Sequence, residues 1–488
     1  MNEWFLTLRN AEAARIADVP VLPPPAFRNA ILDCVSADDS RVVSLFGRRD
    51  GDRVELIVVM ADDAAGELGL IRTRLSDARF ESLAADLPQL QLFEREIAEQ
   101  FDVTPHGHPW LKPVRAQAAT TPFFRVSGEE VHEVAVGPVH AGVIEPGHFR
   151  FQCHGEQVFH LEIALGYQHR GIERALAAGP SKKTVHMIET IAGDTTVGHS
   201  LAYAQAIEAL SRTKPPARAH ALRGIALELE RLANHCGDLG ALAGDVAYLP
   251  TASFCGRIRG DYLNATADLC GSRFGRGFVR PGGVGFDIES GRVQKLADRV
   301  DVATRDAVAA IKLLWSTPTV VERFENTGTV APETAEEIGL VGVAARACGR
   351  GIDVRHDFPY GIYRFVHVPV MTAHHGDVNS RAFVRWLELQ RSAEFVIEQL
   401  RTLPATAVRR ETGALASDSI VVSLTEGWRG EVCHVALTDA NGRFARYKVT
   451  DPSFHNWFAL ALALRDGQIS DFPLCNKSFN LSYCGHDL

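Results

Sequence analysis

The ionisable side chains of His169, Arg170 and Glu173 follow one another closely in a stretch that is rich in glycine and charge. Histidine titrates near neutral pH, so His169 and Glu173 together are candidates for a proton carrier. The alternative is structural, because the histidine could cap a turn and paired charges inside a bundle are more often an ion pair than a relay.

Cysteine spacing bears on metal chemistry. Zinc, iron–sulfur and nickel–iron sites normally draw thiolates from closely spaced cysteine pairs, because several ligands must reach one small ion. No two cysteines of this chain form a C-x-x-C pair, and the nine are scattered. We therefore expect no cofactor bound by this chain and mostly buried, apolar roles for its cysteines. They are Cys34, Cys153, Cys236, Cys255, Cys270, Cys348, Cys433, Cys475 and Cys484.

Charge and hydropathy argue against nucleic acid as a partner and against a membrane-spanning segment. The net charge of −9 leaves no basic field, so nucleic acid is not an expected partner. The longest apolar runs, such as residues 56–61, are far shorter than the roughly 18 residues needed to cross a bilayer. The N-terminus also lacks the features of a secretory signal. We therefore expect a cytoplasmic protein.

The length of 488 residues exceeds the size at which one hydrophobic core stops growing, so two or more domains are expected. Residues 41–46 and 53–60 read as a β-hairpin, and the apolar spacing of 88–101 predicts a helix. We place a compact α+β unit at residues 1–110 and a proline-rich linker at 111–126.

The second unit, residues 127–488, opens with short strands and is then dominated by helices. A hairpin is predicted around Asn441-Gly442, before a helix over 453–465. The predicted fold class is α+β: a small N-terminal α/β domain, then a mainly α-helical bundle with small β-sheets. The expected bundle helices span 183–210, 217–242, 291–314 and 379–403.

The run Glu-Arg-Glu at 94–96 and the tripeptide Gly-His-Pro at 107–109 carry a first resemblance. They resemble the signature of the 30-kDa subunit of complex I, E-R-E-x-x-D-x-F-G followed by G-H-P. Glu99 and Asp102 stand where that pattern has aspartate and glycine. The resemblance implies that residues 1–110 form a 30-kDa-like domain. The charged run would be a solvated helix face or a contact with the neighbouring domain.

A second resemblance covers nearly the whole remaining chain. The motifs at 137–140, 145–149 and 166–173 are similar to those of the 49-kDa subunit of complex I and of the large subunit of group 4 NiFe hydrogenases. Residues 376–381 and 429–431 agree with the same family. A 30-kDa-like domain followed by this large domain is the order of the fused subunit in formate hydrogenlyase-like complexes.

In hydrogenases of this family, two C-x-x-C pairs hold nickel and iron through four thiolates. The matching stretches here are 189–200 and 480–488, and both lack the pair. Cys484 remains nearby, out of register by one residue, and one thiolate cannot replace four. The resemblance therefore implies a form without a nickel–iron centre. The four ligand positions hold Ala192, Thr195, Ser482 and Gly485.

Asp194 and His199 lie on the first former ligand loop. A cavity emptied of metal needs polar lining or water, so both are candidates for cavity or proton-relay residues. In complex I this cavity holds a quinone headgroup between a tyrosine and a histidine. Gly193 stands at the tyrosine position, and His148 lies near the histidine loop as a candidate donor. Glu145 is a further polar residue in these motifs. It is a candidate functional residue, and the alternative is that it holds a loop against the helical bundle.

These resemblances imply the core large subunit of a complex I-like oxidoreductase that couples electron transfer to ion translocation, with NADH or quinone as a redox partner. It would dock a small subunit carrying a 4Fe-4S cluster, antiporter-like membrane subunits and a membrane anchor subunit. It would thus lie at the cytoplasmic face of the inner membrane. The alternative is a scaffold without redox chemistry that links a membrane arm to a soluble partner.

Overall fold

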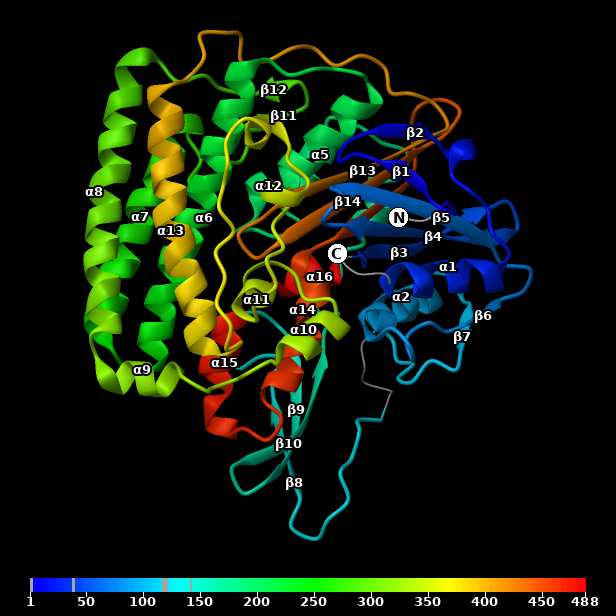
Figure 1. Ribbon diagram of the computed structural model, residues 1–488, viewed down its shortest axis with the longest axis horizontal. Coiled ribbons are helices and arrows are strands. Elements are labelled where there is room, and N and C mark those ends of the chain that lie inside the picture. The colour runs from blue at the N-terminus through cyan, green and yellow to red at the C-terminus, as the bar shows by residue number, and fades with distance from the viewer. Residues whose placement is uncertain (1–2, 37–39, 116–121, 141–142) are drawn as a thin grey trace.

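The computed structural model describes residues 3–36, 40–115, 122–140 and 143–488. Near the N-terminus, an antiparallel sheet takes the order β1-β5-β4-β3 (Figure 1). The predicted hairpin is confirmed as β3 and β4, and Gly51 takes the positive φ of 61° that its turn requires. The strands are β1 (Leu6–Leu8), β3 (Ser40–Asp50), β4 (Arg53–Asp62) and β5 (Glu67–Arg74).

Both faces of this sheet are buried, which explains why β3 and β4 are apolar on both sides. On one face Leu45 and Val58 pack with helices α1 (Pro24–Ser36) and α2 (Gln91–Phe101). On the other face Val59 belongs to the main core of the molecule. The N-terminal part is therefore continuous with the rest of the protein through one hydrophobic interface.

A second four-stranded sheet lies at the centre of the molecule, in the order β15-β14-β13-β2. Its β2 (Ala13–Arg15) comes from the N-terminal part of the chain and pairs with β13 (Ser419–Glu426). The hairpin predicted around Asn441-Gly442 is confirmed as β14 (Glu431–Thr438) and β15 (Phe444–Thr450).

Three smaller sheets complete the strands. An antiparallel sheet has the order β10-β9-β8, and two-stranded pairs are formed by β6 with β7 and by β11 with β12. Their bounds are β6 (Arg79–Glu81), β7 (Thr104–His106), β8 (His132–Val136), β9 (His148–His154), β10 (Gln157–Ala164), β11 (Val279–Arg280) and β12 (Gly283–Val284).

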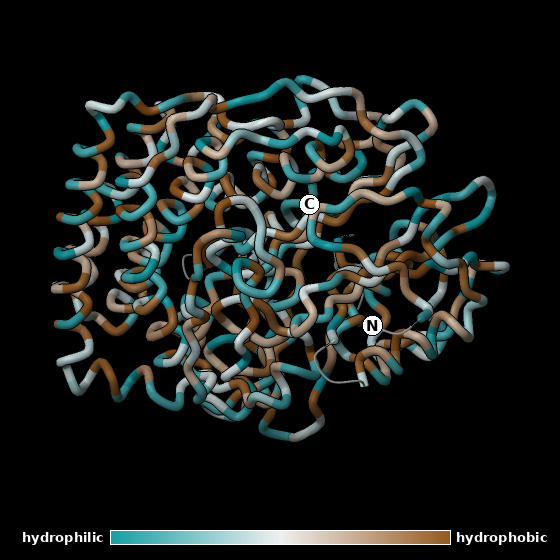
Figure 2. The backbone as a smooth tube through the Cα atoms, turned by 45° about the horizontal axis from the view of Figure 1, so that its top comes forward, coloured by the Kyte–Doolittle hydropathy of each residue, from teal (hydrophilic) through white to brown (hydrophobic). Residues whose placement is uncertain are grey.

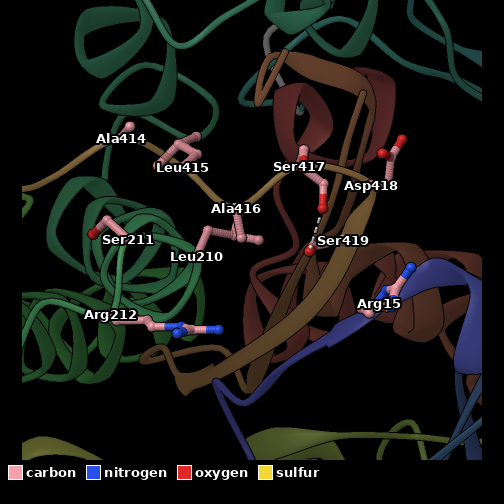
Figure 3. A pocket seen from close by; sticks show the side chains of 10 residues that line it. All are labelled: Arg15, Leu210, Ser211, Arg212, Ala414, Leu415, Ala416, Ser417, Asp418 and Ser419. Atoms are coloured by element: carbon pink, nitrogen blue, oxygen red, sulfur yellow. Dashed lines mark hydrogen bonds between the residues drawn. The ribbon is translucent and has the colours of Figure 1, made fainter. Parts of the chain in front are cut away.

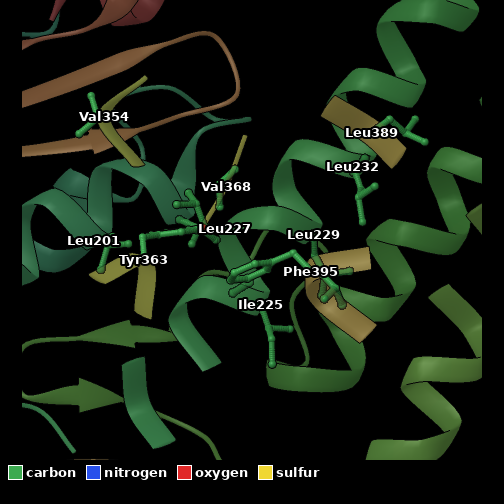
Figure 4. Close-up of a cluster of buried hydrophobic side chains, with 14 of the residues drawn as sticks. Leu201, Ile225, Leu227, Leu229, Leu232, Val354, Tyr363, Val368, Leu389 and Phe395 are labelled. Atoms are coloured by element: carbon green, nitrogen blue, oxygen red, sulfur yellow. The ribbon is translucent and has the colours of Figure 1, made fainter. Parts of the chain in front are cut away.

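A bundle of long helices forms the other end of the molecule (Figure 1). It consists of α6 (Ala217–Asp245), α7 (Leu249–Cys270), α8 (Ser290–Trp315) and α13 (Val378–Arg401). Figure 4 shows part of its apolar core, where Leu229 and Phe395 lie together. Helix α7 has no counterpart among the predicted helices, because glycine and charged residues interrupt its apolar spacing.

The prediction of one helix over 183–210 was wrong. The chain forms α4 (Thr184–Ile188), a loop, and then α5 (Thr196–Leu210). Residues 193–196 read Gly-Asp-Thr-Thr, and such residues favour turns and helix starts over helix interiors. This break creates the loop on which Asp194 lies.

The remaining helices are short, and the mixed α+β class is confirmed. In Figure 2, brown and teal segments alternate along the bundle helices, as expected where each helix buries one face. Among the described residues, no helix is both long and apolar enough to span a bilayer. The short helices are α3 (Ile172–Leu176), α9 (Pro318–Phe324), α10 (Pro332–Glu337), α11 (Gly342–Ala347), α12 (Val354–Asp357), α14 (Pro452–Ala463), α15 (Phe472–Phe479) and α16 (Tyr483–Asp487).

Candidate functional site

Arg429 joins the two former ligand segments. It lies in the turn between β13 and β14, and its Nη1 and Nη2 donate to the two carboxylate oxygens of Asp194 at 2.7 and 2.8 Å. Its Nε donates to the carbonyl oxygen of Asn480 at 2.5 Å. The guanidinium also lies 3.9 Å from the ring centroid of Trp428. A two-pronged ion pair of this kind fixes orientation as well as charge, so the loop before α5 and the segment before α16 are held together.

The side chains at the four former ligand positions have other roles. Ala192 is a buried apolar residue, and the Thr195 hydroxyl lies 3.3 Å from Nη1 of Arg429. Ser482 caps α16, because its Oγ accepts a hydrogen bond from the backbone N–H of Gly485 at 2.9 Å. These side chains supply no thiolate, and they do not fit the ligand set of a nickel–iron site.

Glu145 and Cys484 form a second pair at this site. The carboxylate of Glu145 accepts hydrogen bonds from the backbone and the thiol of Cys484. Burial raises the pKa of Glu145, and the field of Asp194 adds to this, although Arg429 opposes it. Burial and the nearby Glu145 also raise the pKa of the Cys484 thiol. An acid and a thiol with raised pKa values are thus brought beside Arg429.

Helix α6 presents a polar face to the same loop. Glu230 accepts hydrogen bonds from the backbone N–H groups of Val197 and Gly198 at 2.7 and 3.1 Å. Burial, with a contribution from Asp194, raises the pKa of Glu230 to about 8. Four residues later, the amide of Asn234 donates to the carbonyl oxygen of Asp194 at 3.0 Å.

The same face of α6 continues to the C-terminal segment. Asp238 accepts a hydrogen bond from the side chain of Asn480 at 2.6 Å and pairs with Arg385 at 2.8 Å. Glu230, Asn234 and Asp238 recur every four residues, which is the spacing of one helix face. Sequence reasoning missed these residues, although polar side chains at helical spacing within an apolar helix were a usable signal.

His199 is fully buried and belongs to a chain of hydrogen-bonded side chains. Its Nε2 lies 3.1 Å from Oδ2 of Asp451, and its Nδ1 lies 3.0 Å from Nε2 of His434. Nδ1 of His434 lies 2.9 Å from the hydroxyl of Tyr447. Burial and the neighbouring His199 lower the pKa of His434 well below its ordinary value. The partners of His199 come from β14 and the cap of α14, which sequence spacing does not connect to it.

His148 and His169 lie near the C-terminal segment with backbone partners. Nδ1 of His148 lies 3.1 Å from the carbonyl oxygen of Gly137, and its buried Nε2 has no hydrogen-bond partner among the described residues. Nδ1 of His169 lies 2.8 Å from the carbonyl oxygen of Asp487, whose carboxylate accepts from two backbone N–H groups of the 166–168 turn. His169 therefore helps to fasten its loop to the end of the chain.

Glu173 lies at the junction with the N-terminal part. Lys448 places its ammonium group 2.6 Å from Glu96 of α2 and 3.1 Å from Glu173 of α3. Arg446 contacts Glu173 at 2.9 Å, and Arg115 pairs with Glu96. Burial works to raise the pKa of Glu173, but the cations Lys448, Arg446 and Arg115 outweigh it and lower that pKa. Glu96, part of the charged run at 94–96, is thus an interdomain contact rather than a solvated side chain.

A larger set of buried charges fills the interior between α6, α13 and the central sheet. Arg346 donates to Glu388 and Glu426 at 2.9 and 2.8 Å. Nε2 of His235 lies 2.8 Å from Glu388, and Arg231 contacts the same carboxylate at 3.6 Å. These groups are each at most 2% exposed, so every charge needs a partner to offset its desolvation.

A surface pocket lies away from these residues. Its volume is about 450 Å³, and it sits where β2 pairs with β13 (Figure 3). Arg15, Arg212 and Asp418 are its charged lining residues. No predicted site residue lines it, so we locate the candidate site at the former ligand loops, where buried ionisable groups converge.

Several known proteins are similar to large parts of this chain. The family model of the 49-kDa subunit of respiratory-chain NADH dehydrogenase matches residues 245–420. The carbon monoxide-induced hydrogenase of Rhodospirillum rubrum is 29% identical over 352 residues, which cover 72% of this chain and 97% of that protein. Hydrogenase-4 component G of Escherichia coli is 27% identical over 84% of this chain and 76% of its own length.

NADH-quinone oxidoreductase subunit 4 of Thermus thermophilus is 28% identical over 70% of this chain and 90% of its own length. Among solved structures, a chain of the membrane-bound sulfane sulfur reductase, an archaeal respiratory membrane complex, shares the fold with a TM-score of 0.70. It is 20% identical, and the match covers 74% of this chain and 99% of that one. Residues 245–420 therefore form a domain of the 49-kDa subunit family, and the homologues of this chain are group 4 hydrogenase large subunits and NADH-quinone oxidoreductase subunits.

Proposed function

We propose that this chain is the large core subunit of a membrane-associated, complex I-like oxidoreductase that couples electron transfer to ion translocation without a nickel–iron centre. The observation that carries the proposal is the contrast within the site. The four ligand positions supply no thiolate, whereas Asp194, Arg429, Glu145 and Glu230 keep buried or half-buried ionisable groups around them. The carboxyl group of Glu230, whose pKa is raised to about 8, can bind and release a proton near neutral pH.

The relatives support the kind of assembly in this proposal. Their names describe hydrogenases, a formate hydrogenlyase subunit and NADH-quinone oxidoreductase subunits, and the similar solved chain comes from a respiratory membrane complex. In the proposed complex, residues 1–110 are the 30-kDa-like domain, and a small subunit carries the 4Fe-4S cluster. Antiporter-like membrane subunits and an anchor subunit complete the assembly at the cytoplasmic face of the inner membrane.

We propose quinone as the electron acceptor, and another electron carrier is the alternative. A Cβ atom added to Gly193 would meet no described atom within 4 Å, which leaves open space beside the position that we match to the quinone tyrosine of complex I. A headgroup there would lie on the loop that carries Asp194. His148, whose buried Nε2 lacks a partner within the part of the chain that the structure describes, is the candidate donor from the other side.

The proposal is tested on the native complex purified from membranes. Nickel, iron and quinone are quantified, and hydrogen evolution is assayed with a strong reductant. We expect iron at the level of its clusters, nickel far below one atom per complex, and no hydrogen. Reduction of a soluble quinone analogue should acidify or alkalinise the lumen of proteoliposomes. Stoichiometric nickel or hydrogen evolution would contradict the proposal.

The scaffold hypothesis differs in one observation on the same preparation. If the copurified small subunit lacks its cluster, as shown by the absence of an iron–sulfur signal in electron paramagnetic resonance after reduction, the redox role fails. In that case the chain would serve only to connect the membrane arm to a soluble partner.

A further inference from the structure

We infer that the carboxylate of Asp451 occupies the space, and supplies the negative charge, that a thiolate at position 485 would bring to the site. A chain of buried donors from His199, His434 and Tyr447 holds it there. This inference concerns the packing of two buried residues, and it stands whether or not the chain takes part in electron transfer.

Gly485 lies too close to Asp451 to carry a side chain. A Cβ atom added to Gly485 would lie 2.7 Å from Cγ of Asp451 and 2.8 and 2.9 Å from its two oxygens. Real Cβ atoms essentially never come so close to other heavy atoms, so any side chain at position 485 must displace the carboxylate. Glycine is therefore the residue that the present arrangement of this segment admits.

Asp451 cannot easily move away from Gly485. It is fully buried and is the N-cap of α14, where its Oδ1 accepts a hydrogen bond from the backbone N–H of Ser453 at 2.8 Å. Its Oδ2 lies 3.1 Å from Nε2 of His199. Gly485 is equally fixed, because its backbone N–H donates to Ser482. The close approach of the two residues is thus set from both sides.

The hydrogen bonds that lead from Tyr447 to Asp451 all run in one direction. An ionised Asp451 can only accept, so Nε2 of His199 must carry a proton. Nδ1 of neutral His199 then accepts from Nε2–H of His434, and Nδ1 of His434 accepts from the hydroxyl of Tyr447. All three donors therefore point toward one carboxylate. This arrangement compensates for the loss of water around a buried anion.

Arg429 supplies the compensating positive charge. Burial works to raise the pKa of Asp451, but the hydrogen bond from His199 and the positive field of Arg429 outweigh it and lower that pKa. Asp451 in turn is one of the anions that raise the pKa of Arg429, beside Asp194 and Asp238. The site thus retains an anion beside position 485 although no cysteine stands there.

A double-mutant cycle on the full-length chain tests the steric part, with the melting temperature as the readout. We expect Gly485→Ala to lower the Tm by several degrees in the wild-type background and in Asp451→Asn, which keeps the volume of the side chain. In an Asp451→Ala background the same substitution should have little further effect, and the loss of the helix cap cancels within the cycle. Equal effects of Gly485→Ala in all three backgrounds would overturn the inference.

The nitrogen-15 spectra of histidine side chains test the charge. In the wild type, His199 and His434 should both show protonated Nε2 and unprotonated Nδ1. In Asp451→Asn the signals of His199 should change, and in Tyr447→Phe those of His434 should change most. If the wild type shows Nδ1–H tautomers at both residues, the chain does not point toward Asp451 and the inference is refuted. The wild-type spectrum tests the inference even if the alanine variants do not fold.

Discussion

Asp194 and Arg429 lie 235 residues apart in the sequence and form a two-pronged ion pair with N–O distances of 2.7 and 2.8 Å. Through the bond from Arg429 to the carbonyl of Asn480, this pair connects the N-terminal and C-terminal halves of the former metal site. The site therefore keeps its shape through side-chain contacts in the absence of thiolate ligands.

Replacement of Arg429 by lysine should weaken this connection. Lysine retains the positive charge, but a single ammonium cannot satisfy both oxygens of Asp194 and the carbonyl of Asn480. We expect a loss of about 1–3 kcal/mol in the free energy of unfolding, measured by urea denaturation. Arg305→Lys, at an exposed arginine on α8, is the matched control and should change little. Equal stabilities of the two variants would show that Arg429 does not hold the site.

Glu230 should make the stability depend on pH. Its folded pKa of about 8 lies above the ordinary value of 4.5, so the folded state binds the proton more tightly than the unfolded state. The associated stability is fully present below about pH 4.5 and is lost as the pH rises toward 8.

Glu230→Gln removes this titration. The difference in unfolding free energy between the wild type and the variant should therefore change by a few kcal/mol between pH 5 and pH 8.5, with the wild type losing stability as the pH rises. Denaturation curves at half-unit pH intervals measure it. Glu322→Gln, at an exposed position of α9, should give a difference independent of pH. A flat difference for Glu230→Gln as well would contradict the raised pKa.

Cys484 should react with alkylating agents more slowly than its partial exposure suggests. Burial and Glu145 raise the pKa of its thiol, so little thiolate is present at pH 8. In Glu145→Gln the negative neighbour is gone, and we expect a severalfold faster reaction with iodoacetamide, followed by mass spectrometry.

Cys270, the other cysteine that is not fully buried, provides the internal control, since Glu145 is not among the groups that shift its pKa. Its rate should stay the same in both proteins. An unchanged rate at Cys484 would indicate that Glu145 does not control the thiol.

Lys448 should be essential to the attachment of the N-terminal part. Lys448→Met leaves Glu96 and Glu173 buried without their shared cation, although Arg115 and Arg446 remain. Removing one partner of a buried charge cluster typically costs about 3–5 kcal/mol. We expect a loss of this order in urea denaturation, partly restored in Lys448→Met with Glu96→Gln. Lys214→Met, at an exposed lysine, should be neutral. No rescue by Glu96→Gln would mean that packing, and not charge, holds the junction.

Local sequence patterns predicted many of the elements. The hairpins of β3 with β4 and of β14 with β15 follow from apolar, β-branched runs beside strong turn residues, and α6, α8 and α13 follow from apolar spacing. The helix predicted across 183–210 failed because Gly193 and its polar neighbours end it locally. Helix α7 escaped prediction because its buried residues are diluted by glycine and charge.

The sequence by itself determined the family and the loss of the four thiolates, because motif spacing and residue identity are written along the chain. It also placed Asp194 and His199 on a former ligand loop. Only the tertiary structure decided their partners. Arg429, Asp451 and His434 reach them from distant strands and caps, and the ionisation of a buried group depends on which opposite charges and donors the fold brings within about 3 Å.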